Sequence, residues 1–68
     1  MISYEPLWEI LKEKAITSYA LTEKMNFDKS TLYRIKKGKP VTTSTINELC
    51  KILNCETQNI ICYIADEK

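Results

Sequence analysis

The chain has 68 residues, of which 44% are hydrophobic and 28% charged, and its formal net charge is +1. This length excludes a second domain, and the apolar content excludes a disordered chain. No apolar run reaches the roughly 18 to 20 residues that cross a bilayer, and no basic region leads into an apolar leader segment. We therefore expect a single compact helical domain over residues 1–68, located in the cytoplasm.

The first part of the chain predicts two short helices. Pro6 fits the first turn of a helix, and apolar residues follow at helical spacing, which predicts a helix over residues 5–14. Thr17 or Ser18 can cap a second helix of about eight residues. Asn26 follows where the chain must turn sharply, and Asn tolerates the left-handed conformation that such turns demand.

A third, basic helix is predicted over residues 29–37. Asp28 is placed to cap its N-terminus, and Leu32 and Ile35 form its inward pair. Gly38 ends this helix, because glycine adopts the left-handed conformation of a helix C-terminus without strain. The remaining positions of the helix are left on or near the outward surface.

The last part of the chain predicts a longer helix and an apolar tail. One of the hydroxyl residues at 42–44 caps a fourth helix that ends near Asn54. Residues 56–60 resemble a last short helix. The β-branched run 60–65 can form a strand, and residues 2–4 alternate in a way that would pair with it in a small antiparallel ribbon.

Positive charge is concentrated in one segment. Between Lys29 and Lys39 there are five cations and no acid, whereas the chain on either side carries more acidic than basic residues. A small domain that binds a DNA duplex needs basic charge on one face rather than a basic average. The segment therefore indicates a face that meets phosphates.

Two short helices joined by a tight turn, the second basic and ended by Gly, form a helix-turn-helix arrangement. At Leu21, Asn26, Leu32, Ile35 and Gly38 the chain resembles the phage repressor and Cro-like family, and STINELCKILNCETQNII is similar to that family's fourth and fifth helices. The opening and closing segments look like the small stand-alone Cro-like regulators of bacteria, their phages and mobile elements. The resemblance implies an all-α, five-helix repressor-like domain, with the short terminal β-ribbon as an addition.

The resemblance also implies a function. It predicts a sequence-specific, double-stranded DNA-binding transcriptional regulator, a repressor, that acts as a homodimer on the nucleoid. Base reading maps onto Lys29, Ser30, Thr31 and Arg34, at the start of the third helix and one turn further. Arginine can donate two hydrogen bonds to guanine, which favours a base contact for Arg34. The alternatives for Arg34 are a contact to a phosphate and no contact at all, as an ordinary solvated cation.

The candidate contacts to the DNA backbone are hydroxyl, aromatic and basic residues, namely Ser18, Tyr19, Tyr33, Lys36, Lys37, Lys39, Thr42 and Thr43. For Ser18 the alternative is simple helix capping, and for each lysine it is ordinary solubilising charge. Many family members pair an Arg of the first helix with a Glu of the third, whereas Leu11 and Lys36 stand there in this chain. That ion pair should therefore be absent.

The apolar tail has two open interpretations. Ile60, Ile61, Tyr63 and Ile64 either form a dimer interface or close the core of the monomer itself. The tail also keeps a second function open, that of a protein-interaction module of the same fold, antitoxin-like or co-regulatory, without direct DNA reading.

The sequence contains no pattern of residues that is typical of a catalytic site or a metal site. The chain has no His, no Gly-rich phosphate loop and no acid pair in an evident pocket, so we expect no enzyme. Cys50, Cys55 and Cys62 match no common zinc or redox spacing, and Cys50 fits a small buried apolar residue better than a reactive thiol. We expect no cofactor, no metal, no small-molecule ligand and no membrane partner.

Overall fold

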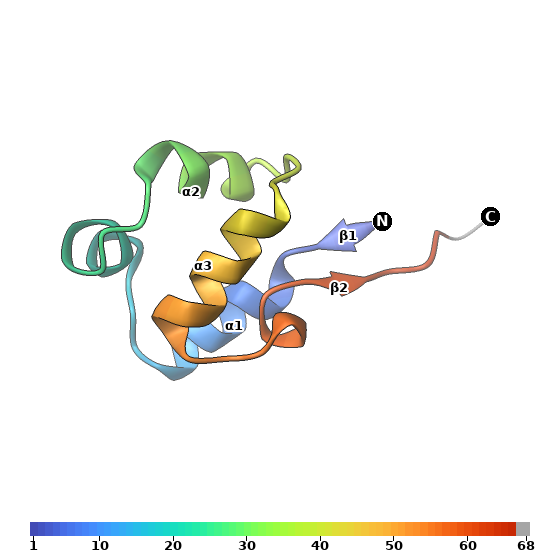
Figure 1. Ribbon diagram of the computed structural model, residues 1–68. Helices are drawn as coiled ribbons and strands as arrows, with labels where there is room; N and C mark the ends of the chain where they lie inside the picture. The colour runs from blue at the N-terminus through green and yellow to red at the C-terminus, as the bar shows by residue number, and fades with distance from the viewer. Residues whose placement is uncertain (67–68) are drawn as a thin grey trace.

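A computed structural model describes residues 1–66 of the chain (Figure 1). In order along the chain it contains β1 (Ile2–Ser3), α1 (Glu5–Glu13), η1 (Ala20–Lys24), α2 (Lys29–Lys36), α3 (Thr43–Leu53), η2 (Thr57–Asn59) and β2 (Cys62–Tyr63). The described residues thus form four helices and a short two-stranded sheet. The predicted count of five helices is not confirmed, because η2 is a single 3₁₀ turn of three residues.

The helices surround one apolar core. Leu32 and Ile35 enter it from α2 as the helical spacing predicted, and Trp8 packs half-buried against it. The buried side chains are Leu7, Ile10, Leu11, Leu21, Phe27, Leu32, Ile35, Leu49, Leu53 and Ile60. Burial of side chains from every helix fixes α2 against the rest of the molecule, so its opposite face is held outward. No helix within residues 1–66 is both long and apolar enough to cross a membrane.

Local side-chain chemistry sets the helix starts. Thr17, Asp28 and Thr42 each accept the backbone N–H of the residue three positions further on, at 3.0, 2.9 and 3.4 Å. Each bond satisfies one of the amides that the first helical turn leaves unpaired. The predictions that Asp28 caps the basic helix and that Thr17 or Ser18 caps the one before it are therefore confirmed, with Thr17 as the residue that accepts.

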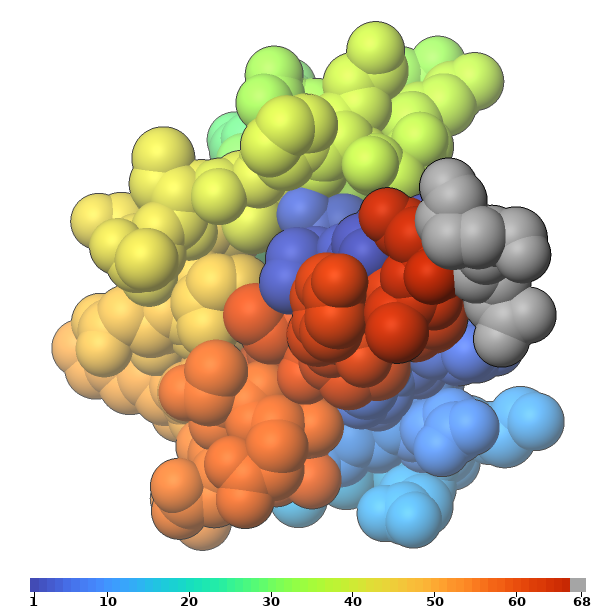
Figure 2. Space-filling view, turned by 90° about the vertical axis from the view of Figure 1, so that its right-hand side faces the viewer, coloured from blue at the N-terminus to red at the C-terminus, as the bar shows by residue number. Residues whose placement is uncertain are grey.

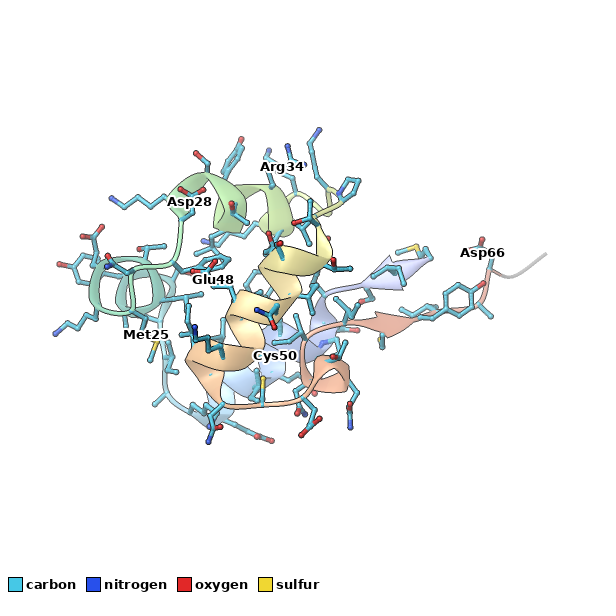
Figure 3. All side chains as sticks on the ribbon, viewed as in Figure 1. Met25, Asp28, Arg34, Glu48, Cys50 and Asp66 are labelled. Carbon is cyan, nitrogen blue, oxygen red and sulfur yellow. The ribbon has the colours of Figure 1, made fainter. Side chains whose placement is uncertain are left out.

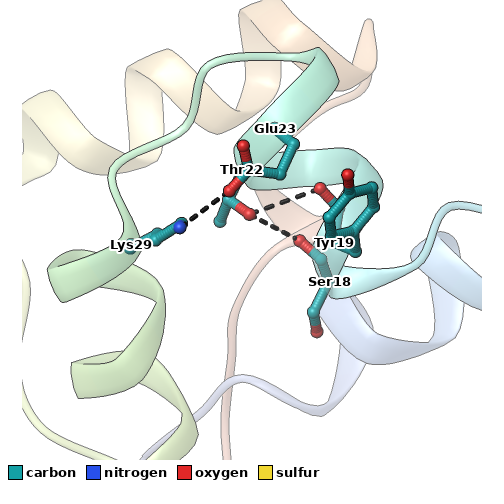
Figure 4. A network of polar contacts seen from close by, with 5 residues as sticks. All are labelled: Ser18, Tyr19, Thr22, Glu23 and Lys29. Carbon is teal, nitrogen blue, oxygen red and sulfur yellow. Dashed lines mark hydrogen bonds and ion pairs between the residues drawn. The ribbon is translucent and has the colours of Figure 1, made fainter.

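The helix of residues 18–24 widens into a π-helix over η1. The Met25 N–H bonds to the Ala20 carbonyl at 3.0 Å, five residues back. Thr22 donates its hydroxyl proton to the carbonyls of Ser18 and Tyr19, at 3.1 and 3.3 Å (Figure 4). Hydroxyl donation to carbonyls of the preceding turn competes with the regular helical bonds and is a recognised cause of local bending.

The two ends of the described chain meet in the predicted ribbon. β1 pairs antiparallel with β2, with Ile2 opposite Tyr63 and Ser3 opposite Cys62. The ribbon continues one step further, where the Ile64 N–H donates to the Met1 carbonyl at 2.7 Å. Figure 2 looks onto this face, where the C-terminal segment lies against the N-terminal one. The ribbon therefore holds residues 62–64 against residues 1–3, just before α1.

For Ile60 the structure decides between the two interpretations of the tail. Ile60 is 0% exposed and belongs to the core, so it is not part of an exposed apolar run. The cause is η2, which packs against α1 and α3 and turns Ile60 inward. Beyond it Ile61 is half-buried, whereas Tyr63 and Ile64 are 68% and 44% exposed. The apolar surface of the tail is thus smaller than the sequence run indicated.

Candidate nucleic-acid interface

The outward face of α2 carries the polar and basic residues that the sequence predicted. Because Leu32 and Ile35 are buried, the positions between and beyond them are held outward. The exposed residues on and just after this helix are Lys29, Ser30, Tyr33, Arg34, Lys36 and Lys37. In Figure 3 Arg34 lies near the C-terminal end of α2, on the far side of the molecule from α1. The buried pair therefore fixes the orientation of α2, and the basic residues of the helix all lie on its exposed side.

The start of α2 is shaped by Asp28 and Thr31. One carboxylate oxygen of Asp28 accepts both the Thr31 amide, at 2.9 Å, and the Thr31 hydroxyl, at 2.8 Å. The hydroxyl bond and then the amide bond hold the pKa of Asp28 below its ordinary value, because both stabilise the charged carboxylate. The hydroxyl proton of Thr31 is therefore engaged, and Thr31 offers an outside partner an acceptor oxygen and a methyl group.

Lys29 forms an ion pair with Glu23, which sequence reasoning did not place in the site. The Lys29 Nζ lies 2.7 Å from the Glu23 Oε2 (Figure 4). The hydrogen bond and the negative charge of Glu23 raise the pKa of Lys29. The pair joins η1 to α2 across the turn between them and partly neutralises the first cation of the basic face. No helical spacing rule connects two residues six positions apart on different helices, so the sequence carried no signal for it.

Arg34 is tied to the loop that follows α2. Its Nη2 donates to the Pro40 carbonyl at 2.8 Å. Gly38, at φ 77°, lets the chain reverse so that the Lys39 N–H reaches the Arg34 carbonyl at 2.9 Å. The Tyr4 hydroxyl donates to the Lys39 carbonyl at 2.7 Å from the other side. The loop is therefore fixed both by α2 and by the residue after β1.

Tyr33 and Lys37 act together on the outer surface of α2. The Lys37 Nζ lies 5.3 Å from the centre of the Tyr33 ring, which is within the range of a cation–π contact. Tyr33 itself is 60% exposed. The contact keeps the ring and the ammonium group on one side of the helix, where both can reach the same partner.

Two hollows flank α2 and divide the predicted residues between them. The first has a volume of about 260 Å³, lies between η1 and α2, and is lined by Ser18, Tyr19, Thr22, Lys29, Leu32, Tyr33 and Lys36. The second, of about 400 Å³, lies between α2 and the start of α3 and is lined by Thr31, Arg34, Pro40, Val41, Thr42 and Thr45. Most predicted contact residues thus gather on the two sides of one helix, whereas Thr43 lines a different hollow.

A comparison with known protein families identifies the family to which this helix arrangement belongs. A sequence model of the Cro/C1-type HTH DNA-binding domain matches residues 6–66. The chain belongs to this family. Membership implies binding to double-stranded DNA, and η1 and α2 occupy the positions of the two helices of the motif. In this Cro/C1-type domain Leu11 packs in the apolar core, and Lys36 lies exposed on α2.

One solved structure is similar over nearly the whole chain. The crystal structure of transcriptional regulator VanUg, Form II, superposes with a TM-score of 0.82 at 28% sequence identity. The match covers 96% of this chain and 87% of that one. No curated protein sequence matches this chain significantly. The Cro/C1-type fold is therefore supported by both the sequence model and a solved structure.

Proposed function

We propose that this Cro/C1-type domain is a sequence-specific transcriptional repressor that reads the major groove with α2. The observation that carries the proposal is the outward face of α2, where exposed basic and hydroxyl side chains stand on a helix locked by Leu32 and Ile35. An α-helix fits the major groove, and its side chains then reach the base edges. The similarity to a protein named as a transcriptional regulator supports the same function.

Within this proposal the base-reading residues are Lys29, Ser30, Thr31 and Arg34. The guanidinium of Arg34 has five N–H donors, so its bond to Pro40 leaves a pair for O6 and N7 of a guanine. Thr31 contacts bases through its acceptor oxygen and its methyl group, which suits the thymine methyl or a cytosine amino group. Lys29 contacts a base after its ion pair with Glu23 has broken and its ammonium group has turned to the DNA.

We propose that the two hollows beside α2 bind the phosphate backbones of the two DNA strands that border the major groove. On the side of η1, Ser18, Tyr19, Tyr33 and Lys36 surround the first hollow. On the other side, Thr42 lines the second hollow, with Lys37, Lys39 and Thr43 nearby along the chain. Hydroxyl and ammonium groups donate to phosphate oxygens without regard to sequence, so these contacts fix the register of α2 in the groove.

We further propose that the chain acts as a homodimer. A single recognition helix contacts few base pairs, and a second copy across a two-fold axis doubles the site. The exposed part of the ribbon supplies the interface, namely Tyr63 and Ile64 with Ile61 beside them. Ile60 is not part of it.

The exposed ribbon also favours the second candidate, a protein-interaction module that does not read DNA. Enrichment of sequences from a pool of random duplexes separates the two. A repressor enriches one motif, with two-fold symmetry if the dimer forms, whereas an interaction module enriches none at low salt. A variant with Arg34→Ala, Lys36→Ala and Lys37→Ala is the control, and it should enrich nothing while keeping the wild-type circular dichroism spectrum.

A further inference from the structure

The C-terminal end of α3 brings two cysteines together. Asn54, at φ 53°, reverses the chain after the last helical turn, and the Cys55 N–H then donates to the Cys50 carbonyl at 3.0 Å. In this type of helix ending a contact between the side chains of the two bonded residues is frequent. Standard bond lengths across the hydrogen bond limit the distance between the two Cα atoms to about 7 Å. Disulfides span Cα distances of about 4.4–6.8 Å.

The environment of the two thiols agrees with direct contact. Both side chains are half-buried, and both line one open hollow of about 640 Å³, so they are reachable from solvent. Burial raises the pKa of the Cys55 thiol, and the adjacent Cys50 raises it further. Figure 3 places Cys50 on the half of α3 that lies far from α2.

We propose that Cys50 and Cys55 form a reversible intramolecular disulfide, which makes the end of α3 a thiol-oxidation site. The site is separate from the DNA-reading face, since Thr42 caps the opposite end of the same helix. Cys62 is exposed on β2 and is not part of the pair. The bond would lock the turn from which the chain enters η2 and delivers Ile60 to the core.

A hydroperoxide is the oxidant that the reaction needs. The thiolate of Cys50 attacks one peroxide oxygen, the O–O bond breaks, and Cys50 becomes a sulfenic acid as hydroxide or alkoxide leaves. The raised pKa keeps the Cys55 thiol protonated at first, and Cys55 acts second. Its sulfur, on losing its proton, attacks the sulfenic sulfur, the S–S bond forms, and the hydroxyl leaves as water. The two sulfurs together lose two electrons, and the peroxide gains them.

The test uses the full chain with Cys62→Ser, treated with hydrogen peroxide, unfolded without reductant and alkylated with iodoacetamide. We expect the monomer to lose the mass of two hydrogen atoms, to take up no alkyl group, and to recover two alkylation sites after dithiothreitol. The matched controls add Cys50→Ser or Cys55→Ser to the same background, and neither should give a monomer that lacks two hydrogens. Circular dichroism before oxidation establishes that all three variants are folded.

Three results would overturn the proposal. The first is that both thiols of the Cys62→Ser chain stay open to alkylation, and the second is that they oxidise only to disulfide-linked dimers. The third is that they acquire oxygen without losing the two hydrogens, which would mean that the resolving attack by Cys55 does not occur. These readouts do not involve DNA, so they are independent of the proposed repressor function.

Discussion

Arg34→Ala is the substitution that separates base reading from backbone contact. In the structure Arg34 uses Nη2 for the Pro40 carbonyl at 2.8 Å and has donors left for a guanine. Loss of a bidentate base contact costs about 1–3 kcal/mol, which is roughly a 5- to 150-fold weaker Kd on the preferred site. Selectivity at one base pair should relax at the same time. Fluorescence anisotropy with the enriched duplex and with single-base variants of it measures both effects.

Lys37→Ala is the matched control for this experiment. Lys37 follows α2 and rests over Tyr33, where it can reach a phosphate. Its removal should weaken preferred and random duplexes by the same factor and reduce the steepness of the salt dependence by about 0.9 in the log–log slope. Thermal unfolding shows whether either variant has lost stability. Equal losses on preferred and random DNA for Arg34→Ala would refute the base-reading role of Arg34.

Other substitutions test the elements around α2. Glu23→Gln removes the negative charge that is paired with Lys29, so it should tighten binding to random duplex DNA and steepen its salt dependence in a filter-binding assay, and weaker binding would contradict this. Ile60→Ala should lower the free energy of unfolding by about 2–5 kcal/mol in urea, because Ile60 is fully buried. At a protein concentration low enough to keep the chain monomeric, Ile64→Ala should change it by no more than about 0.5 kcal/mol, and equal effects would contradict the burial of Ile60. Because the pKa of Asp28 is lowered in the folded state, its contribution to stability is present above the ordinary value of 3.8 and is lost as the pH falls through the lowered value. Wild type should therefore lose more thermal stability than Asp28→Asn over that range, and parallel curves would show that the carboxylate makes no difference.

The sequence predicted those parts of the fold that depend on neighbouring residues. Asp28 caps α2, and Asn26 and Gly38 adopt positive φ where a turn was expected, because each of these roles follows from the side chain and its local position. The inward pair Leu32 and Ile35 follows from helical periodicity alone. The outward face of the basic helix is therefore a property that the amino-acid sequence dictates locally.

Contacts between elements could not be derived in this way. Lys29 meets Glu23, and Arg34 meets Pro40, only because of the angles at which η1, α2 and the following loop pack. The apolar run of the tail does not reveal which residues are buried, since that depends on what lies opposite, so the sequence left both interpretations of Ile60 open. Cys50 and Cys55 fit no redox spacing, and their proximity depends on the left-handed Asn54 between them.

The central claim, that α2 and its flanks bind a specific duplex, is tested most directly by the salt dependence of Kd on the enriched duplex and on a scrambled duplex of equal length. With several of the five cations between Lys29 and Lys39 on phosphates, both log–log plots should be steep, with about −0.9 for each phosphate contacted. The enriched duplex should bind more tightly at every salt concentration. Binding that does not respond to salt, or equal affinity for the two duplexes throughout, would contradict the account.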